Sequence, residues 1–205
     1  MKNLWKSFFN TRDDMNSNTK IALSALLVAV FFVNNRFFNP SPIWYANASL
    51  AIVAVMLAAF IMGAKWAAIV GGLGDIVGAL TLPRGGAYFF GFTFNWILIG
   101  LIFGLLIYRG RNKTDRRLLI NMIIASVLAY ALVQIPLASF WLYWMFASVD
   151  TYLVIAGTRA WIFAIVLVVQ IIVAWPLCKF LREPIEKFLL IEDDEEDDII
   201  DSDQA

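Results

Sequence analysis

The stretch GGLGDIVGALTLPRGGAYFFGFTFNWILIG, residues 71–100, contains two apolar runs separated by Pro83-Arg84-Gly85-Gly86. The runs extend outward to about residues 64 and 108, and about 20 apolar residues suffice to cross the hydrocarbon core of a bilayer. Proline cannot continue a helix and paired glycines free the backbone. The stretch therefore predicts two membrane helices, 64–81 and 91–108, joined by a short loop.

The whole chain shares this apolar character. It has 205 residues, of which 61% are hydrophobic and 16% charged, which is outside the usual range for a soluble domain. We therefore predict an all-α membrane protein, a six-transmembrane-helix bundle. The predicted spans are 21–38, 46–63, 64–81, 91–108, 118–141 and 155–181. A tight turn at Gly63-Ala64-Lys65-Trp66 divides the second span from the third.

Positive charges predict the orientation of these spans. When the six helices are threaded alternately, thirteen of the sixteen Lys and Arg residues fall on one side. The positive-inside rule then places both termini in the cytoplasm. Nine of the sixteen acidic residues lie in 192–203, and a like-charge run of this kind is typical of a solvated, disordered tail. The predicted divisions are a cytoplasmic N-terminal segment 1–20, a membrane domain 21–187 and an acidic cytoplasmic tail 188–205.

The residue inventory excludes several kinds of chemistry. The chain has no histidine and a single cysteine, Cys178, so Cys/His metal sites and His-based acid–base catalysis are absent. Neither the spacing of a P-loop nor that of G-x-G-x-x-G occurs around Gly71, Gly74 and Gly78. An intramembrane enzyme is disfavoured, because paired intramembrane aspartates and a Gly-x-Ser-Gly motif are also missing. We expect no catalytic residues, no bound metal and no cofactor.

Asp75 is an acidic residue inside an apolar helix. An ionised acid at such a position costs about 2.5–3.5 kcal/mol on insertion scales, so it should face the bundle interior and have a partner. The candidate partners are Arg36, Arg84 and Arg159, the three arginines on the predicted outer side. Asp75 either forms a buried ion pair or cap near the end of the helix, or it contacts a ligand directly.

The broken loop after Asp75 presents aromatic side chains at the membrane surface. They form either an interfacial belt or a surface on which a flat ligand stacks, with Arg84 and Thr93 or Asn95 as polar contacts. The three outer arginines either reach the lipid headgroups or form a site for an anionic solute. The candidate substrate-binding residues are Arg36, Arg84, Tyr88, Phe89, Phe90, Phe92, Thr93, Asn95 and Arg159, with Asp75, Gly71 and Gly78 shaping the site.

Small residues mark one face of the first predicted helix. Ala22, Ala25 and Ala29 are spaced at i, i+3 and i+7, and small side chains let helices approach closely in lipid. The pattern is compatible with packing inside the protein and with contact to another membrane subunit. On the pattern alone, internal packing is the preferred interpretation.

The stretch from Gly71 to Gly100 resembles the substrate-binding S component of energy-coupling factor (ECF) vitamin transporters, and most closely the folate-specific branch. The matching positions are Gly71, Asp75, Ile76, Gly78, Pro83, Gly85, Gly91, Phe92 and Thr93. Folate-type members are also similar in ending the first helix with an arginine and a phenylalanine, here Arg36-Phe37, and in carrying an arginine where the sixth begins, here Arg159. The string covers about thirty residues, and the six-helix plan extends the likeness over 20–185.

This resemblance implies an S component in a bacterial plasma membrane, which captures a water-soluble vitamin outside the cell. It implies a transmembrane coupling subunit, contacted through Ala22, Ala25 and Ala29, and two ATPase subunits that use the ATP. Arg36 and Arg159 would hold the carboxylates of folate and the aromatic loop its pterin. Pantothenate or a queuosine-like base is the alternative vitamin, and an ion-coupled transporter that acts alone through Asp75 is the alternative class.

Overall fold

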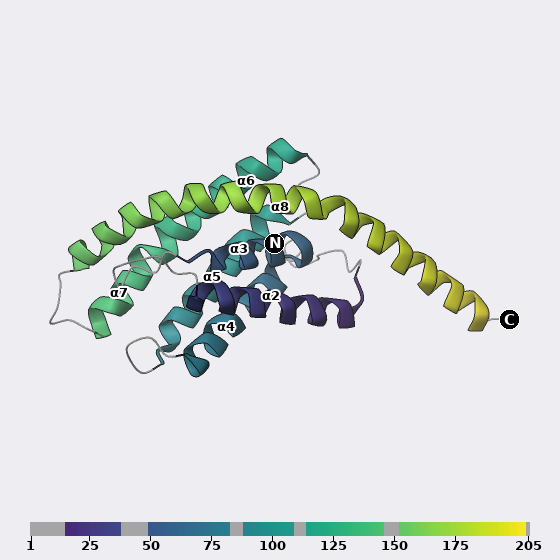
Figure 1. Ribbon diagram of the computed structural model, residues 1–205, viewed down its shortest axis with the longest axis horizontal. Coiled ribbons are helices and arrows are strands. Elements are labelled where there is room, and N and C mark those ends of the chain that lie inside the picture. Colours follow the sequence, from purple (N-terminus) through teal and green to yellow (C-terminus); the bar gives the residue numbers. More distant parts are fainter. Residues whose placement is uncertain (1–14, 38–48, 83–87, 109–113, 146–151, 204–205) are drawn as a thin grey trace, which may run out of the picture.

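The computed structural model describes residues 15–37, 49–82, 88–108, 114–145 and 152–203, and every regular element within them is helical (Figure 1). The prediction of an all-α protein is therefore confirmed. The elements in chain order are α2 (Ser17–Phe37), α3 (Ala51–Met62), α4 (Ala64–Thr81), α5 (Phe90–Ile107), α6 (Asp115–Ala129), the π-helix η1 (Tyr130–Gln134), α7 (Pro136–Met145) and α8 (Tyr152–Asp203).

Five segments are long and apolar enough to cross a membrane. They are α2, α4, α5, the continuous run Asp115–Met145 that joins α6, η1 and α7, and Tyr152–Ile185 within α8. The predicted span 46–63 is represented by α3, which has 12 residues, and part of that span lies outside the described residues. At 1.5 Å per residue α3 is too short to cross the hydrocarbon core by itself. The count of six spanning helices and the cytoplasmic location of both termini stay predictions.

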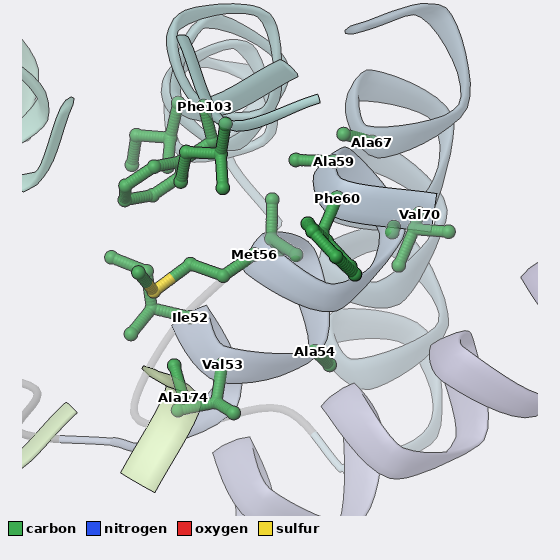
Figure 2. Packing of buried hydrophobic residues seen from close by; sticks show 14 of the residues in the cluster. Ile52, Val53, Ala54, Met56, Ala59, Phe60, Ala67, Val70, Phe103 and Ala174 are labelled. Atoms are coloured by element: carbon green, nitrogen blue, oxygen red, sulfur yellow. The ribbon is translucent and has the colours of Figure 1, made fainter. Parts of the chain in front are cut away.

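Helix α3 lies at the centre of the bundle. Every residue from Ala51 to Met62 except Leu57 is buried, and the helix packs against α2, α4, α5 and α8. Figure 2 shows its side chains pointing toward Ala67 and Val70 of α4, Phe103 of α5 and Ala174 of α8. A helix that is apolar on all sides is stable only when neighbours cover every side. This explains why α3 shows no polar face in the sequence.

A single glycine separates α3 from α4. Gly63 has φ 85° and ψ −168°, a backbone conformation that is open to glycine and costly for other residues. Its amide still donates to the carbonyl of Ala59, and its carbonyl accepts from Ala67. The chain therefore reverses without a connecting loop, which confirms the predicted turn at the boundary between the second and third helices.

Glycines bring α4 and α5 into backbone contact. A Cβ atom built on Gly71 would lie 2.7 Å from the carbonyl oxygen of Trp96, and on Gly100 or Gly104 it would meet the backbone of Ala67 or Ala64. Such close approach gains dispersion contacts, which drive helix association in a membrane. Of the helix pairs in the described residues, α4 and α5 pack most extensively. Their register fixes where Asp75 and Thr93 meet.

The π-helix η1 interrupts the run from α6 to α7. The backbone hydrogen bond spans five residues here and not four, because Ile135 N–H donates to the carbonyl of Tyr130 at 2.9 Å. Pro136 follows directly; its ring has no N–H and would clash with the carbonyl four residues earlier in a regular helix. A π-bulge absorbs that clash and is often found at functional positions. The predicted span 118–141 is confirmed in place, and its internal distortion is a structural finding.

Helix α8 is longer than the span predicted for it. It extends beyond the other helices to Asp203 (Figure 1), whereas we expected a disordered tail from residue 188. A helix that already has many turns adds residues without a new nucleation cost, which explains the continuation. The division of the chain into a membrane domain and an acidic cytoplasmic tail, 188–205, stays a prediction. Closer to the bundle, Arg182 and Lys179 pair with Asp115 of α6 at 2.8 and 3.2 Å, which ties the two helices together.

Candidate functional site

Three helix ends meet at one end of the bundle. The C-terminal turn of α2 carries Arg36, whose guanidinium lies against Gly78 in the last part of α4: a Cβ atom on Gly78 would be 2.7 Å from Arg36 Nε. One turn earlier, Gly74 accommodates the ring of Phe31, which also packs edge-on against Trp96 of α5 at 4.7 Å. The glycines on this face of α4 therefore make room for the side chains of α2.

Asp75 forms a hydrogen-bonded chain with the start of α5. Thr93 donates its hydroxyl proton to Asp75 Oδ2 at 2.6 Å, and the Tyr88 hydroxyl lies 2.7 Å from the same Thr93 oxygen. Because a threonine hydroxyl has one proton to donate, Tyr88 must be the donor to Thr93. Asp75 also interacts electrostatically with Arg36. Of the two candidate arginines that the structure describes, Arg36 and Arg159, Arg36 is the one whose charge acts on Asp75.

The aromatic residues of the predicted loop divide into an inner and an outer set. The rings of Phe89 and Phe92 lie 5.9 Å apart, and Phe89 also contacts Trp141 of α7 at 5.5 Å. Gly91 makes this cluster possible, because a Cβ atom there would lie 2.9 Å from Trp141 Cδ2. Phe90 points away and is 60% exposed. The inner rings present a stacking surface, whereas Phe90 suits a membrane interface.

Asn95 lies on the opposite side of α5 from Thr93. It is 2% exposed, and its Oδ1 accepts a hydrogen bond from the indole Nε1 of Trp141 at 3.2 Å. Helix α5 therefore carries two polar contacts near its N-terminal end, one toward α4 and one toward α7. Thr93 and Asn95, which make these contacts, are both among the predicted site residues.

Arg159 belongs to a second cluster, built by η1 and α8. Its Nε donates to the carbonyl of Gln134 at 3.0 Å and its Nη2 to Gln134 Oε1 at 3.2 Å, while the guanidinium lies 5.0 Å from the centre of the Phe163 ring. Phe163 stacks on Tyr130, whose hydroxyl donates to Gln170 Oε1. Arg159 is 4% exposed. These contacts of Arg159 hold the π-helix against α8.

The remaining predicted residues are placed as follows. Arg84 lies outside the described residues, together with the proline and glycines of the loop. Gly71 lies in the α4–α5 contact, where a Cβ atom would meet the backbone of Trp96. Ala22, Ala25 and Ala29 are exposed on α2, whereas the buried positions of that helix are Lys20, Ser24, Leu27, Phe31 and Asn35. The small-residue face is therefore not covered by this chain within the described residues.

Several residues of the two clusters were missed from the sequence. Trp141, Gln134, Tyr130 and Gln170 lie inside spans that we assigned by hydropathy alone. A glutamine in an apolar run is a signal that could have found Gln134 and Gln170, because an uncharged amide in lipid still requires hydrogen-bond partners. Trp141 gave no such signal, since tryptophan is common near membrane interfaces. No group of three or more acidic or cysteine side chains suited to a metal ion occurs in the described part of the chain.

These features define the class of protein: a multi-pass helical membrane protein with a polar and aromatic site at one end of its bundle. Residues 19–185 match the family model of the ECF transporter, substrate-specific component, and the chain belongs to that family. It is a family of transporter components and not of enzymes, and this membership together with the apolar helices confirms the predicted multi-pass location in the plasma membrane.

Two relatives extend the comparison. The folate transporter FolT of Leuconostoc mesenteroides subsp. mesenteroides is 29% identical over 127 residues, which are 62% of this chain and 65% of that protein. The crystal structure of FolT bound with folic acid has a TM-score of 0.65 and 31% sequence identity, covering 76% of this chain and 88% of that one. The resemblance to the folate-specific branch is thereby supported by sequence and by structure.

Proposed function

We propose that this chain is the substrate-capture subunit of an ECF-type transporter and that its ligand is folate. The observation that carries the proposal is that Arg36 and the Tyr88–Thr93–Asp75 chain, on the α4 side of α5, lie at the same end of the bundle as the inner aromatic rings on its α7 side. The likeness to FolT bound with folic acid supports the choice of ligand.

The chemistry of this end suits a ligand with a flat ring system and an anionic part. Phe89 and Phe92 offer ring faces and edges for stacking. Arg36 offers a guanidinium that forms charge-assisted, bidentate bonds with a carboxylate. The charge of Asp75 interacts favourably with that guanidinium, and the hydrogen bond from Thr93 to Asp75 ties the start of α5 to α4. In this proposal Asp75 maintains the geometry of the site and takes no part in coupling to an ion.

The proposal includes the partners of an S component. ATP is hydrolysed by two separate ATPase subunits, and a transmembrane coupling subunit contacts the exposed alanine face of α2, formed by Ala22, Ala25 and Ala29. Exposure of all three alanines favours an intermolecular role, because internal packing would bury them. This chain itself needs no cofactor, and its membrane domain binds the vitamin before the complex moves it.

The first test is direct binding of folate to the purified chain in detergent. Replacing Arg36 by alanine removes a charge-assisted contact, so we expect the folate affinity to fall by about tenfold to a hundredfold while the protein stays folded. Isothermal titration measures the affinity and thermal unfolding checks the fold. Arg117→Ala is the matched control, because Arg117 is an exposed arginine at the start of α6, away from the site. Unchanged affinity in Arg36→Ala would remove Arg36 from the site.

The same titration separates folate from the alternative vitamins. If pantothenate or a queuosine-like base binds and folate does not, the ligand is wrong and the S-component role stands. If uptake into vesicles follows an ion gradient and needs no ATPase subunits, the role itself is wrong, and the transporter that acts alone replaces it.

The second test concerns the alanine face of α2. The variants Ala25→Trp and Ala29→Trp place bulk on a surface that is exposed in the isolated chain, so we expect normal folate binding and at least a tenfold loss of ATP-driven uptake. Val168→Trp on α8 is the control, since Val168 is 55% exposed and lies on another helix. Normal uptake by both alanine variants would leave the face without a partner role.

A further inference from the structure

Asn95 has an amide group that is only half satisfied. Its Oδ1 accepts from Trp141 Nε1, but its Nδ2 is buried and has no hydrogen-bond partner within the described residues. A buried amide donor without a partner costs about 1–3 kcal/mol. Native proteins retain such groups rarely, and a functional reason is then expected.

The orientation of this amide is fixed by chemistry. An indole N–H only donates, so the group facing Trp141 Nε1 must be the amide oxygen of Asn95. Rotating the amide would set two donors against each other. Trp141 is itself packed by Phe89 at 5.5 Å and by Trp144, which stacks on it at 6.2 Å. The indole therefore holds Oδ1 on one side and directs the two Nδ2 protons to the other.

Asn95 occupies the same end of the bundle as the proposed site. It is one turn into α5 from Gly91, where the Phe89 and Trp141 rings meet, and two residues from Thr93. The group with the unused donors thus adjoins the inner aromatic surface, on the side of α5 away from Asp75. The Thr93–Asp75 chain is complete in itself, whereas the Asn95–Trp141 pair leaves a donor open.

We propose that Asn95 Nδ2 donates a hydrogen bond to the bound ligand, and that Trp141 is the positioning residue that fixes this polarity. The ligand must then present a hydrogen-bond acceptor, such as a ring carbonyl or ring nitrogen, to α5 beside the aromatic surface. A group that only donates is rejected there, because it would meet the Nδ2 protons. The inference rests on the proposed function, since it assigns part of the specificity of the same site; folate has acceptors of both kinds in its pterin ring.

The experiment uses the full chain in detergent and folate as the probe. Asn95→Asp keeps the shape and the acceptor for Trp141 but replaces the donor by an acceptor, so folate affinity should fall by at least about tenfold near pH 8. Lowering the pH to about 5 should recover part of this loss, because a protonated carboxyl group donates again. Wild type is titrated at both pH values to correct for the ionisation of folate itself.

The second variant tests Trp141 without altering Asn95. Trp141→Phe keeps an aromatic ring against Phe89 but releases the amide, so we expect an affinity loss of about threefold to tenfold that does not depend on pH. Trp161→Phe on α8, where Trp161 is 73% exposed and belongs to neither cluster, is the control and should bind as wild type does. If the Asn95→Asp protein does not fold, the comparison of Trp141→Phe with its control still tests whether Trp141 orients Asn95 toward the ligand.

The outcomes are distinct. Wild-type affinity in both Asn95→Asp and Trp141→Phe overturns the inference and leaves the proposed function intact. A loss in Asn95→Asp that is the same at both pH values shows a structural role and also overturns it. A wild-type protein that binds no folate overturns the proposed function, and this inference with it.

Discussion

The two halves of the bundle are held together in different ways. Helices α4 and α5 meet backbone to backbone, because Gly71, Gly100 and Gly104 remove the side chains between them. The run from α6 to α7 meets α8 through buried polar side chains, with Arg159 bonded to Gln134 and Tyr130 bonded to Gln170. The first contact depends on shape and the second on hydrogen-bond partners.

The difference shows how each half positions functional groups. Contact between backbones allows almost no movement, so α4 and α5 hold Asp75 and Thr93 in a fixed register. Polar contacts around a π-helix can be exchanged for others at modest cost, since each bond is worth about 1–3 kcal/mol. We therefore expect substitutions between α4 and α5 to prevent or strongly impair folding. Substitutions between the α6–α7 run and α8 should lower the free energy of unfolding by smaller amounts.

The largest effect is expected for Gly104→Leu. Any side chain there meets the backbone of Ala64, which cannot move aside as a flexible side chain would. We expect a loss of at least about 3 kcal/mol in the free energy of unfolding, or failure to fold. Thermal unfolding in detergent is the measurement. Gly157→Ala on α8 is the matched control, since nothing lies within 4 Å of a Cβ atom at that position, and it should be neutral.

A smaller effect is expected for Arg159→Ala. It deprives the Gln134 carbonyl and side chain of their donor, so the free energy of unfolding should fall by about 2–3 kcal/mol. Arg159→Lys should not restore it, because a lysine does not reproduce the forked geometry that reaches both oxygens. Folate affinity is measured on the same samples. Lost binding with unchanged stability would instead make Arg159 a ligand residue, as the family resemblance implies.

The smallest effect is expected at the other end of this network. Tyr130→Phe removes the donor to Gln170 Oε1 and should cost about 1–2 kcal/mol, because it leaves a buried acceptor unsatisfied. Gln170 is fully buried, and its Nε2 has no partner within the described residues. The double variant Tyr130→Phe/Gln170→Leu removes both polar groups and should be more stable than Tyr130→Phe alone. Equal stability would show that the amide is hydrated.

Much of the architecture was predictable because hydropathy is local. The span 64–81 coincides with α4, the turn at Gly63 was expected from the break in the apolar pattern, and 91–108 lies one residue from α5. The shortness of α3 and the π-helix before Pro136 were not foreseen. Both depend on what neighbouring helices cover and on how a helix relieves a proline clash, and apolar composition encodes neither.

The sequence predicted which residues belong to the candidate site, but it did not predict how they are grouped in space. Arg36, Asp75 and Thr93 were named from their residue types and from the family resemblance, but their grouping required the α4–α5 register. Arg159 was grouped with Arg36 by charge, whereas in the structure it donates a hydrogen bond to Gln134 of η1, between α6 and α7. Trp141 was not named, because nothing local distinguishes it from the other aromatics of its helix.

The sequence by itself determined that this is an apolar, multi-helix membrane protein without histidine chemistry, and it supplied the motif by which the family was recognised. These properties depend on composition and on short-range order along the chain. Only the tertiary structure decided that the charge of Arg36 acts on Asp75, that the alanine face of α2 is exposed, and that Trp141 orients Asn95. Each of these depends on helices far apart in the chain meeting at a distance of a few ångströms, which packing alone sets.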